Sequence, residues 1–210
     1  MSVKVKICGI TSPADGIAAA DAGADMIGLM FCPQSPRHVS IEVAGQIAQA
    51  VPPFVVKVGV FVSASEELVA EAIASCGLSL LKFHGDESPE FCASFGNRAF
   101  KAYRGVPDAS ERTYIRNEAP ALLVDAAVSG SYGGTGLTAD WSAAARLAKH
   151  YPLLLAGGLN PDNVAEAVRQ VIPWGVDVAS GVESSPGKKD PGRMRSFVQA
   201  VRSALFTSPA

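Results

Sequence analysis

Two side chains suited to acid–base chemistry stand where predicted strands end. Cys8 closes the predicted strand 3–8, and Asp125 follows the apolar run 121–124. An apolar run of this kind is typical of a parallel strand that is covered on both faces. A thiolate and a carboxylic acid on opposite sides of a ligand can take a proton from carbon and give one to oxygen. Cys8 and Asp125 are therefore candidate catalytic residues.

Each of the two residues also has a structural explanation. Cys8 by itself could be a buried core thiol, and Asp125 could cap the turn that follows its strand. Position favours chemistry, because the active sites of barrels and open α/β sheets gather at the carboxyl ends of the strands. Lys6 should also face inward, two residues before Cys8, and a nearby cation favours a thiolate.

Glycine-rich loops follow three predicted strands and suggest a site for a phosphate group. Glycine lets backbone amides approach the oxygens of an anion without a Cβ in the way. Barrels often bind phosphate with the loops after their last two strands, and two of the three loops lie there, although each could also be an ordinary turn. We expect the ligand to be a phosphorylated small molecule, bound by Gly134, Thr135, Gly136, Gly157, Gly158, Ser180 and Gly181.

Two charged residues complete the candidate binding site. Arg37 lies in the loop 33–38, where two prolines restrict the backbone and help to aim a guanidinium at a carboxylate; a solvated surface arginine is the alternative. Asp177 lies in the last predicted strand. It could contact the hydroxyl groups of a sugar, or it could be a buried acid paired with Lys6 or another cation. His84, which ends the fourth strand, could line the pocket or be structural.

Predicted strands and helices alternate along the whole chain. Eight such units with right-handed crossovers indicate the α/β class and a single (β/α)8 TIM barrel domain over residues 1–210. The alternative, a doubly wound open sheet, would normally carry GxGxxG after its first strand, and residues 8–13 read CGITSP. The predicted helices begin near residues 13, 40, 63, 88, 107, 140, 160 and 190, and the predicted strands are 3–8, 25–31, 54–62, 79–83, 99–103, 121–124, 153–156 and 176–179.

Composition argues against several classes of partner. Charged residues make up 18% of the chain and the formal net charge is −2, so we expect no nucleic acid partner. Nothing resembles a transmembrane span, and the first residues lack the apolar core of a signal peptide, so we expect no membrane and a cytoplasmic location. The 4 cysteines form no CxxC pair, which favours reduced thiols and gives no reason to expect a metal.

In this order and spacing, a set of motifs resembles the phosphoribosylanthranilate isomerase family of tryptophan biosynthesis, over nearly the whole chain. The resemblance implies a barrel enzyme without cofactor or metal. It would isomerise the aminoaldose N-(5-phosphoribosyl)anthranilate to 1-(2-carboxyphenylamino)-1-deoxyribulose 5-phosphate. We expect a monomer or a homodimer. The motifs are KICGIT at 6–11, SPR at 35–37, VGVF at 58–61, GGTG at 133–136 after Asp125, DW at 140–141, GGLNP at 157–161 and SGVE at 180–183.

The resemblance also implies roles for single residues. Asp125 matches the family's general acid, which protonates the furanose ring oxygen so that the ring opens to a Schiff base. Cys8 matches the general base, which then takes the C2′ proton. Arg37 matches the residue that holds the carboxylate of anthranilate, and the glycine loops match the phosphate site. Lys82 departs from the family pattern, which usually has glutamine there; an inward Lys82 would change the charge of the pocket or pair with an acid.

Three other functions stay open at this point. The aminoaldose isomerase of histidine biosynthesis also binds phosphate in a barrel, but it places an aspartate where this chain has Cys8, so dual specificity is one alternative. A phosphosugar-binding module without catalysis would not need Cys8, Asp125 and Arg37 together. A redox sensor at Cys8 would lack a resolving cysteine nearby in the sequence.

Overall fold

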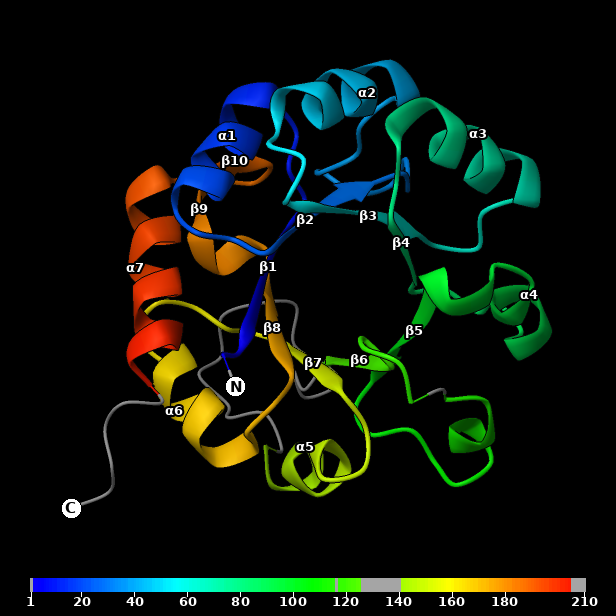
Figure 1. The fold of residues 1–210 in the computed structure, drawn as a ribbon, viewed down its shortest axis with the longest axis vertical. Helices are drawn as coiled ribbons and strands as arrows, with labels where there is room; N and C mark the ends of the chain where they lie inside the picture. The colour runs from blue at the N-terminus through cyan, green and yellow to red at the C-terminus, as the bar shows by residue number, and fades with distance from the viewer. Residues whose placement is uncertain (1, 116, 126–140, 205–210) are drawn as a thin grey trace.

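Eight parallel strands close into a barrel, and their order around the ring is their order in the chain (Figure 1). The computed structural model describes residues 2–115, 117–125 and 141–204. The ring closes where β8 pairs with β1. This is the (β/α)8 barrel predicted from the sequence. The barrel strands are β1 (Lys4–Cys8), β2 (Met26–Met30), β3 (Val56–Phe61), β4 (Leu80–Phe83), β5 (Ala99–Arg104), β6 (Leu122–Asp125), β7 (Leu153–Ala156) and β8 (Gly175–Val178).

Helices surround the barrel and cover the outer face of its strands (Figure 1). Within the described residues, each helix is too short or too polar to cross a lipid bilayer. The helices are α1 (Pro13–Asp21), α2 (Ile41–Ala50), α3 (Glu66–Cys76), α4 (Pro89–Ser94), α5 (Trp141–Ala148), α6 (Val164–Val171) and α7 (Pro191–Ser203). The shorter elements are the 3₁₀ turns η1 (Gly96–Arg98), η2 (Glu111–Tyr114) and η3 (Ser180–Val182), and a hairpin of β9 (Glu183–Ser185) and β10 (Lys188–Lys189).

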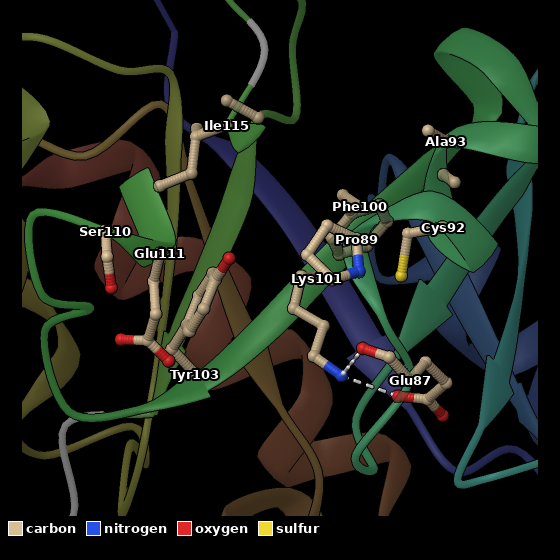
Figure 2. Close-up of a pocket in the computed structure, with 12 residues that line it drawn as sticks. Glu87, Pro89, Cys92, Ala93, Phe100, Lys101, Tyr103, Ser110, Glu111 and Ile115 are labelled. Atoms are coloured by element: carbon tan, nitrogen blue, oxygen red, sulfur yellow. Dashed lines mark hydrogen bonds and ion pairs between the residues drawn. The ribbon is translucent and has the colours of Figure 1, made fainter. Parts of the chain in front are cut away.

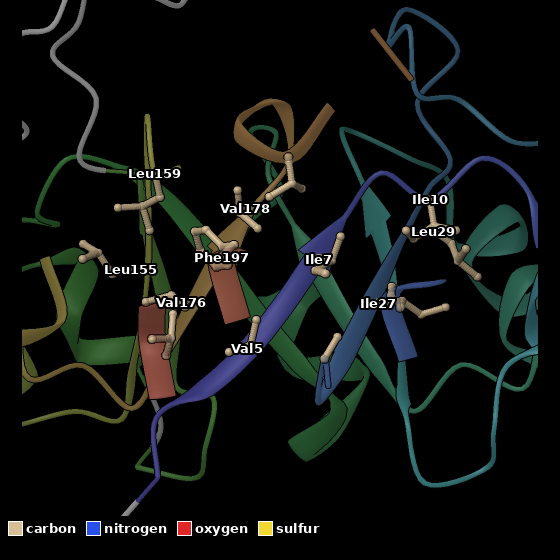
Figure 3. Packing of buried hydrophobic residues seen from close by; sticks show 14 of the residues in the cluster. Val5, Ile7, Ile10, Ile27, Leu29, Leu155, Leu159, Val176, Val178 and Phe197 are labelled. Atoms are coloured by element: carbon tan, nitrogen blue, oxygen red, sulfur yellow. The ribbon is translucent and has the colours of Figure 1, made fainter. Parts of the chain in front are cut away.

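Alternation of side chains gives each strand an outer and an inner face. On the outer face, Val5 and Ile7 of β1 and Val176 and Val178 of β8 belong to one buried cluster with Phe197 of α7 (Figure 3). The side chains between them face the interior of the barrel. Because helices cover one face and the barrel encloses the other, polar residues on the inner face are removed from water. The inner apolar cluster consists of Met26, Val58, Phe100, Ala102, Leu123, Leu154 and Ala156.

Side-chain caps fix where several helices begin. Ser12, Ser40, Ser65 and Ser88 each accept a hydrogen bond from the backbone N–H three residues later, and Asp190 does the same for α7. Such caps satisfy N–H groups that have no partner in the first helical turn. The predicted caps Ser12 and Ser40 are confirmed.

The capping box predicted at 63–66 is wrong. Ser65, and not Ser63, caps α3. The backbone of Ser63 has a φ of 48°, and its N–H donates to Glu87 Oε1 at 2.7 Å. This interaction fixes Ser63 in the loop before the helix.

Two predicted helices are shorter than the sequence pattern indicates. The helix predicted from residue 107 is reduced to η2 within the described residues, because Asp108 Oδ1 accepts hydrogen bonds from the N–H groups of Ser110 and Glu111 and holds a turn. The helix predicted from Asn160 begins only at Val164. Asn160 Oδ1 there accepts from two backbone N–H groups and forms a similar turn.

Candidate active site

Cys8 and Lys6 lie on the inner face of β1. Their neighbours Val5 and Ile7 pack outward (Figure 3), while Cys8 is 5% exposed and Lys6 is 0% exposed. Gly28 of β2 leaves room for both, because a Cβ at that position would lie 2.7 Å from Cys8 Sγ and 2.9 Å from Lys6 Nζ. Both side chains therefore lie against the same point of β2. The predicted inward orientation of Lys6 and Cys8 is therefore confirmed.

Asp177 of β8 joins two lysines in the interior of the barrel. Lys6 Nζ lies 2.9 Å from its Oδ1 atom, and Lys82 Nζ lies 3.3 Å from its Oδ2 atom. Each of the three side chains is at most 6% exposed. We call Lys6, Lys82 and Asp177 the inner cluster. Pairing with Lys6, one of the two roles predicted for Asp177, is confirmed, and contact with a sugar stays a prediction.

The inner cluster favours the charged forms of Lys6 and Asp177 and disfavours the charged form of the nearby His84. Burial opposes the charged forms of Lys6 and Asp177, but their attraction prevails, so the pKa of Lys6 is raised and the pKa of Asp177 is lowered. His84 follows β4. Burial, aided by the charge of Lys82, lowers the pKa of His84 to about 4. His84 is thus neutral at pH 7, and its buried Nε2 atom has no hydrogen-bond partner among the described residues.

Arg37 belongs to a second cluster, built from loops after β2 and β8. Its Nε and Nη2 atoms donate to the two carboxylate oxygens of Glu183, each at 2.7 Å, which is the fork geometry that guanidinium and carboxylate favour. Lys189 Nζ donates to the same carboxylate at 2.7 Å and to the carbonyl oxygen of Ala179 at 3.1 Å. We call Arg37, Glu183 and Lys189 the outer cluster.

The outer cluster is close to Cys8. A Cβ at Gly9, the next residue, would overlap the Arg37 side chain, and the φ of 74° at Gly9 also favours glycine. Hydrogen bonds to Glu183 raise the pKa of Arg37, and the charge of Cys8 adds to this rise. Burial lowers the pKa of Lys189, while Glu183 and Cys8 oppose that change. Cys8 therefore lies near cations of both clusters.

The glycine loops after β7 and β8 contact each other. A Cβ at Gly181 would overlap the carbonyl oxygen of Leu159, so this close approach requires glycine. Gly157 and Gly158 have φ values of 99° and 65° and turn the chain directly after β7. Together with Ser180, they lie at the carboxyl ends of adjacent strands, as the phosphate-site prediction requires. Phosphate binding itself stays a prediction.

Asp125 ends β6 on the inner face of the barrel. Leu123 packs in the inner apolar cluster and Val124 packs outward, so the alternation directs Asp125 inward. Cys8 and Asp125 thus lie at the same end of one barrel, on strands separated by β7 and β8. The other predicted phosphate contacts, Gly134, Thr135 and Gly136, lie outside the described residues.

The match to known proteins covers nearly all of this barrel. A family model described as N-(5'phosphoribosyl)anthranilate (PRA) isomerase matches residues 5–200. The chain belongs to this family. A curated N-(5'-phosphoribosyl)anthranilate isomerase from Magnetococcus marinus is 52% identical over 204 residues, which cover 97% of each chain. The enzyme of the same name from Geobacter sulfurreducens is 48% identical over 95% of this chain and 98% of its own.

Solved structures agree with the sequence match. The phosphoribosyl anthranilate isomerase of Thermotoga maritima superposes with a TM-score of 0.85 at 39% identity, over 96% of this chain and 99% of that chain. A phosphoribosyl anthranilate isomerase in complex with reduced 1-(o-carboxyphenylamino)-1-deoxyribulose 5-phosphate gives a TM-score of 0.82 at 38% identity, with the same coverage. The predicted family is confirmed. These matches support neither the histidine-pathway alternative nor the binding module.

Three residues of the candidate site were not assigned a role from the sequence. Gly28 left a signal, because an isolated glycine within an apolar strand often marks a close approach. Glu183 falls in the SGVE motif, which does not reveal its partner Arg37. Lys189 gave no signal in the sequence, because a lysine in a polar stretch is expected to be exposed. Only the β9–β10 hairpin pairs it with Glu183.

A separate cavity of about 630 Å³ lies beside β5, between α4 and η2 (Figure 2). Lys101 and Tyr103 line it, and Lys101 Nζ pairs with Glu87 at 2.7 Å. Burial raises the pKa of Cys92 to about 11 and that of Tyr103 to about 12, so both are neutral at pH 7. The cavity includes none of the residues assigned to isomerase chemistry, and we place no reaction there.

Proposed function

We propose that this chain isomerises N-(5'-phosphoribosyl)anthranilate to 1-(2-carboxyphenylamino)-1-deoxyribulose 5-phosphate, a step of tryptophan biosynthesis, with Cys8 and Asp125 as its base and acid. The observation that carries the proposal is the position of these two residues on the inner face of one barrel end, in a chain of this family. A base and an acid on separate strands can act on two atoms of one ligand that lies across the barrel.

Proton transfer accounts for the whole rearrangement. Asp125 gives its proton to the furanose ring oxygen, and the C1′–O bond breaks as the anthranilate nitrogen forms a Schiff base with C1′. Cys8, as a thiolate, takes the proton from C2′. The electrons of that C–H bond form an enolamine. C1′ then gains a proton as the C2′ hydroxyl loses one, which gives the aminoketose and returns the acid and the base to their starting forms. No net oxidation occurs, since C1′ is reduced as C2′ is oxidised.

The charged groups around the two catalytic residues suit the two anionic ends of this substrate. Arg37 uses Nε and Nη2 for Glu183, and in our proposal its exposed side meets the carboxylate of anthranilate. Gly157, Gly158, Ser180 and Gly181 would bind the phosphate through backbone amides. Gly134, Thr135 and Gly136 complete this phosphate site as a prediction from the sequence. We place the enzyme in the cytoplasm, as a monomer or homodimer.

The deciding experiment follows the fluorescence of freshly prepared phosphoribosylanthranilate after the purified protein is added. Cys8→Ala and Asp125→Asn should each lower kcat by about 10²–10⁴-fold while the substrate still binds, because each removes one general acid or base. A thermal unfolding scan of each variant verifies that the barrel is intact.

The possible results separate the alternatives. A variant with near-normal kcat would remove that residue from the mechanism. An intact wild type that binds a product analogue without turnover would favour the binding module. If neither turnover nor binding is seen, the histidine-pathway aminoaldose is the substrate to test next.

A further inference from the structure

The charges of the inner cluster do not balance. Lys6 and Lys82 are both buried, and they share the single carboxylate of Asp177. An uncompensated charge in a protein interior is costly, so a further negative charge nearby is favoured. Cys8 is the adjacent group that can supply it, because its Sγ atom and Lys6 Nζ both lie against Gly28 of β2.

Lys82 produces the imbalance. Without it, Lys6 and Asp177 would form a neutral pair. With it, the carboxylate is divided between two ammonium groups, which leaves Lys6 less fully compensated on the side that faces Cys8. Gly28 keeps that side open, since a Cβ there would meet both Cys8 Sγ and Lys6 Nζ.

Other charged groups near Cys8 do not cancel this effect. In the outer cluster, Arg37 and Lys189 share Glu183, so that cluster also carries one excess positive charge. His84 is neutral at pH 7. At the ends of β5 and β6, Arg104 and Asp125 add one cation and one acid.

We propose that Lys82 is a positioning residue that favours the Cys8 thiolate by sharing Asp177 with Lys6. This inference deepens the proposed function, on which it rests, by naming what holds its base in the reactive form. It predicts that a lysine buried on β4, too far along the sheet to be a neighbour of β1, changes the reactivity of a thiol on β1.

The test is alkylation of Cys8 by iodoacetamide across a pH series without substrate, read by mass spectrometry of the Cys8 peptide. Lys82→Gln keeps a donor for Asp177 but removes the charge, and Lys82→Met removes both. We expect the pH of half-maximal alkylation to rise by about one unit in each variant, so that the rate at neutral pH falls by about tenfold. The plateau rate at high pH reports access to Cys8 and should not change.

Three controls test whether the charge of Lys82 causes the change in Cys8 alkylation. Lys82→Arg should restore the wild-type midpoint. Lys57→Gln removes a lysine from β3, where alternation directs it to the outer face, and should change nothing. Cys32 in the same sample should keep its own profile in each variant.

The results separate this proposal from the proposed function. In the isomerase assay, Lys82→Gln should move the acid limb of the kcat profile to higher pH, with little change in KM. An unchanged Cys8 midpoint in folded Lys82→Gln and Lys82→Met would overturn the proposal, whatever the turnover. Failure of the wild type to turn over phosphoribosylanthranilate would overturn the function and leave the alkylation result standing.

Discussion

Two clusters of the same charge composition lie next to Cys8, and they differ in their contact with solvent. Each has two cations and one carboxylate. In the inner cluster, all side chains are at most 6% exposed. In the outer cluster, Lys189 is fully buried but the Arg37 side chain is 21% exposed.

Because the two clusters differ in exposure, they can act on different groups although their charge composition is the same. The excess positive charge of the inner cluster cannot reach solvent, so it acts on Cys8 within the barrel. The excess charge of the outer cluster reaches the mouth through Arg37, where it can meet an anionic ligand. In our proposal, burial around a carboxylate with two cations therefore decides whether the cluster acts on Cys8 or meets the substrate.

Removal of the shared carboxylate should show the contrast most strongly. Asp177→Asn leaves two buried ammonium groups without a counter-ion, and loss of one partner of a buried ion pair costs about 3–5 kcal/mol. Glu183→Gln should cost less, because it leaves only one buried cation, Lys189, without its counter-ion, while Arg37 can turn toward water. Urea unfolding at pH 7 measures both free energies of unfolding. An equal loss in the two variants would show that exposure does not distinguish the clusters.

His84 should report the inner cluster through pH. Its pKa is about 4 in the folded protein and 6.5 as a free side chain. Between these values the unfolded chain binds more protons, so stability is fully present above pH 6.5 and is lost as the pH falls toward 4. We expect a loss of about 2 kcal/mol from this group, allowing for its partial exposure.

The matched variant for that pH series is His84→Gln, whose stability should change less between pH 6.5 and 4.5. Lys82→Gln should show an intermediate slope, because the charge of Lys82 contributes to the lowered pKa of His84. Parallel curves for wild type and His84→Gln would rule out His84 as the titrating group.

The smallest expected effect concerns substrate binding through the outer cluster. Glu183→Gln loosens the fork that holds Arg37. We expect KM to rise by about tenfold with little change in kcat, because the lost binding free energy corresponds to roughly one charged hydrogen bond. Arg37→Ala should raise KM further, since it removes the ligand contact itself. Glu183→Asp should recover part of the loss. A fall in kcat alone would mean that Arg37 acts on the transition state.

Local signals predicted more of the fold than of the charge network. Ser40 and the helix through Ala50 were evident because a cap and an apolar stripe are encoded within a few residues. The helix predicted from residue 107 was wrong because Asp108 competes for the N–H groups that would begin it. Cys8 and Asp125 could be selected from their place at strand ends, but not the ion pairs beside them.

The sequence by itself determined the barrel and the inner face on which Cys8, Lys6 and Asp125 lie. Strand periodicity and turn chemistry are local, and eight repeated units leave one closed arrangement. Only the tertiary structure decided which charges share a carboxylate. Lys6 and Asp177 are 171 positions apart, and Arg37 and Glu183 are 146 apart. Pairing at such separations depends on closure of the ring, which sets the burial and hence the strength of each charge.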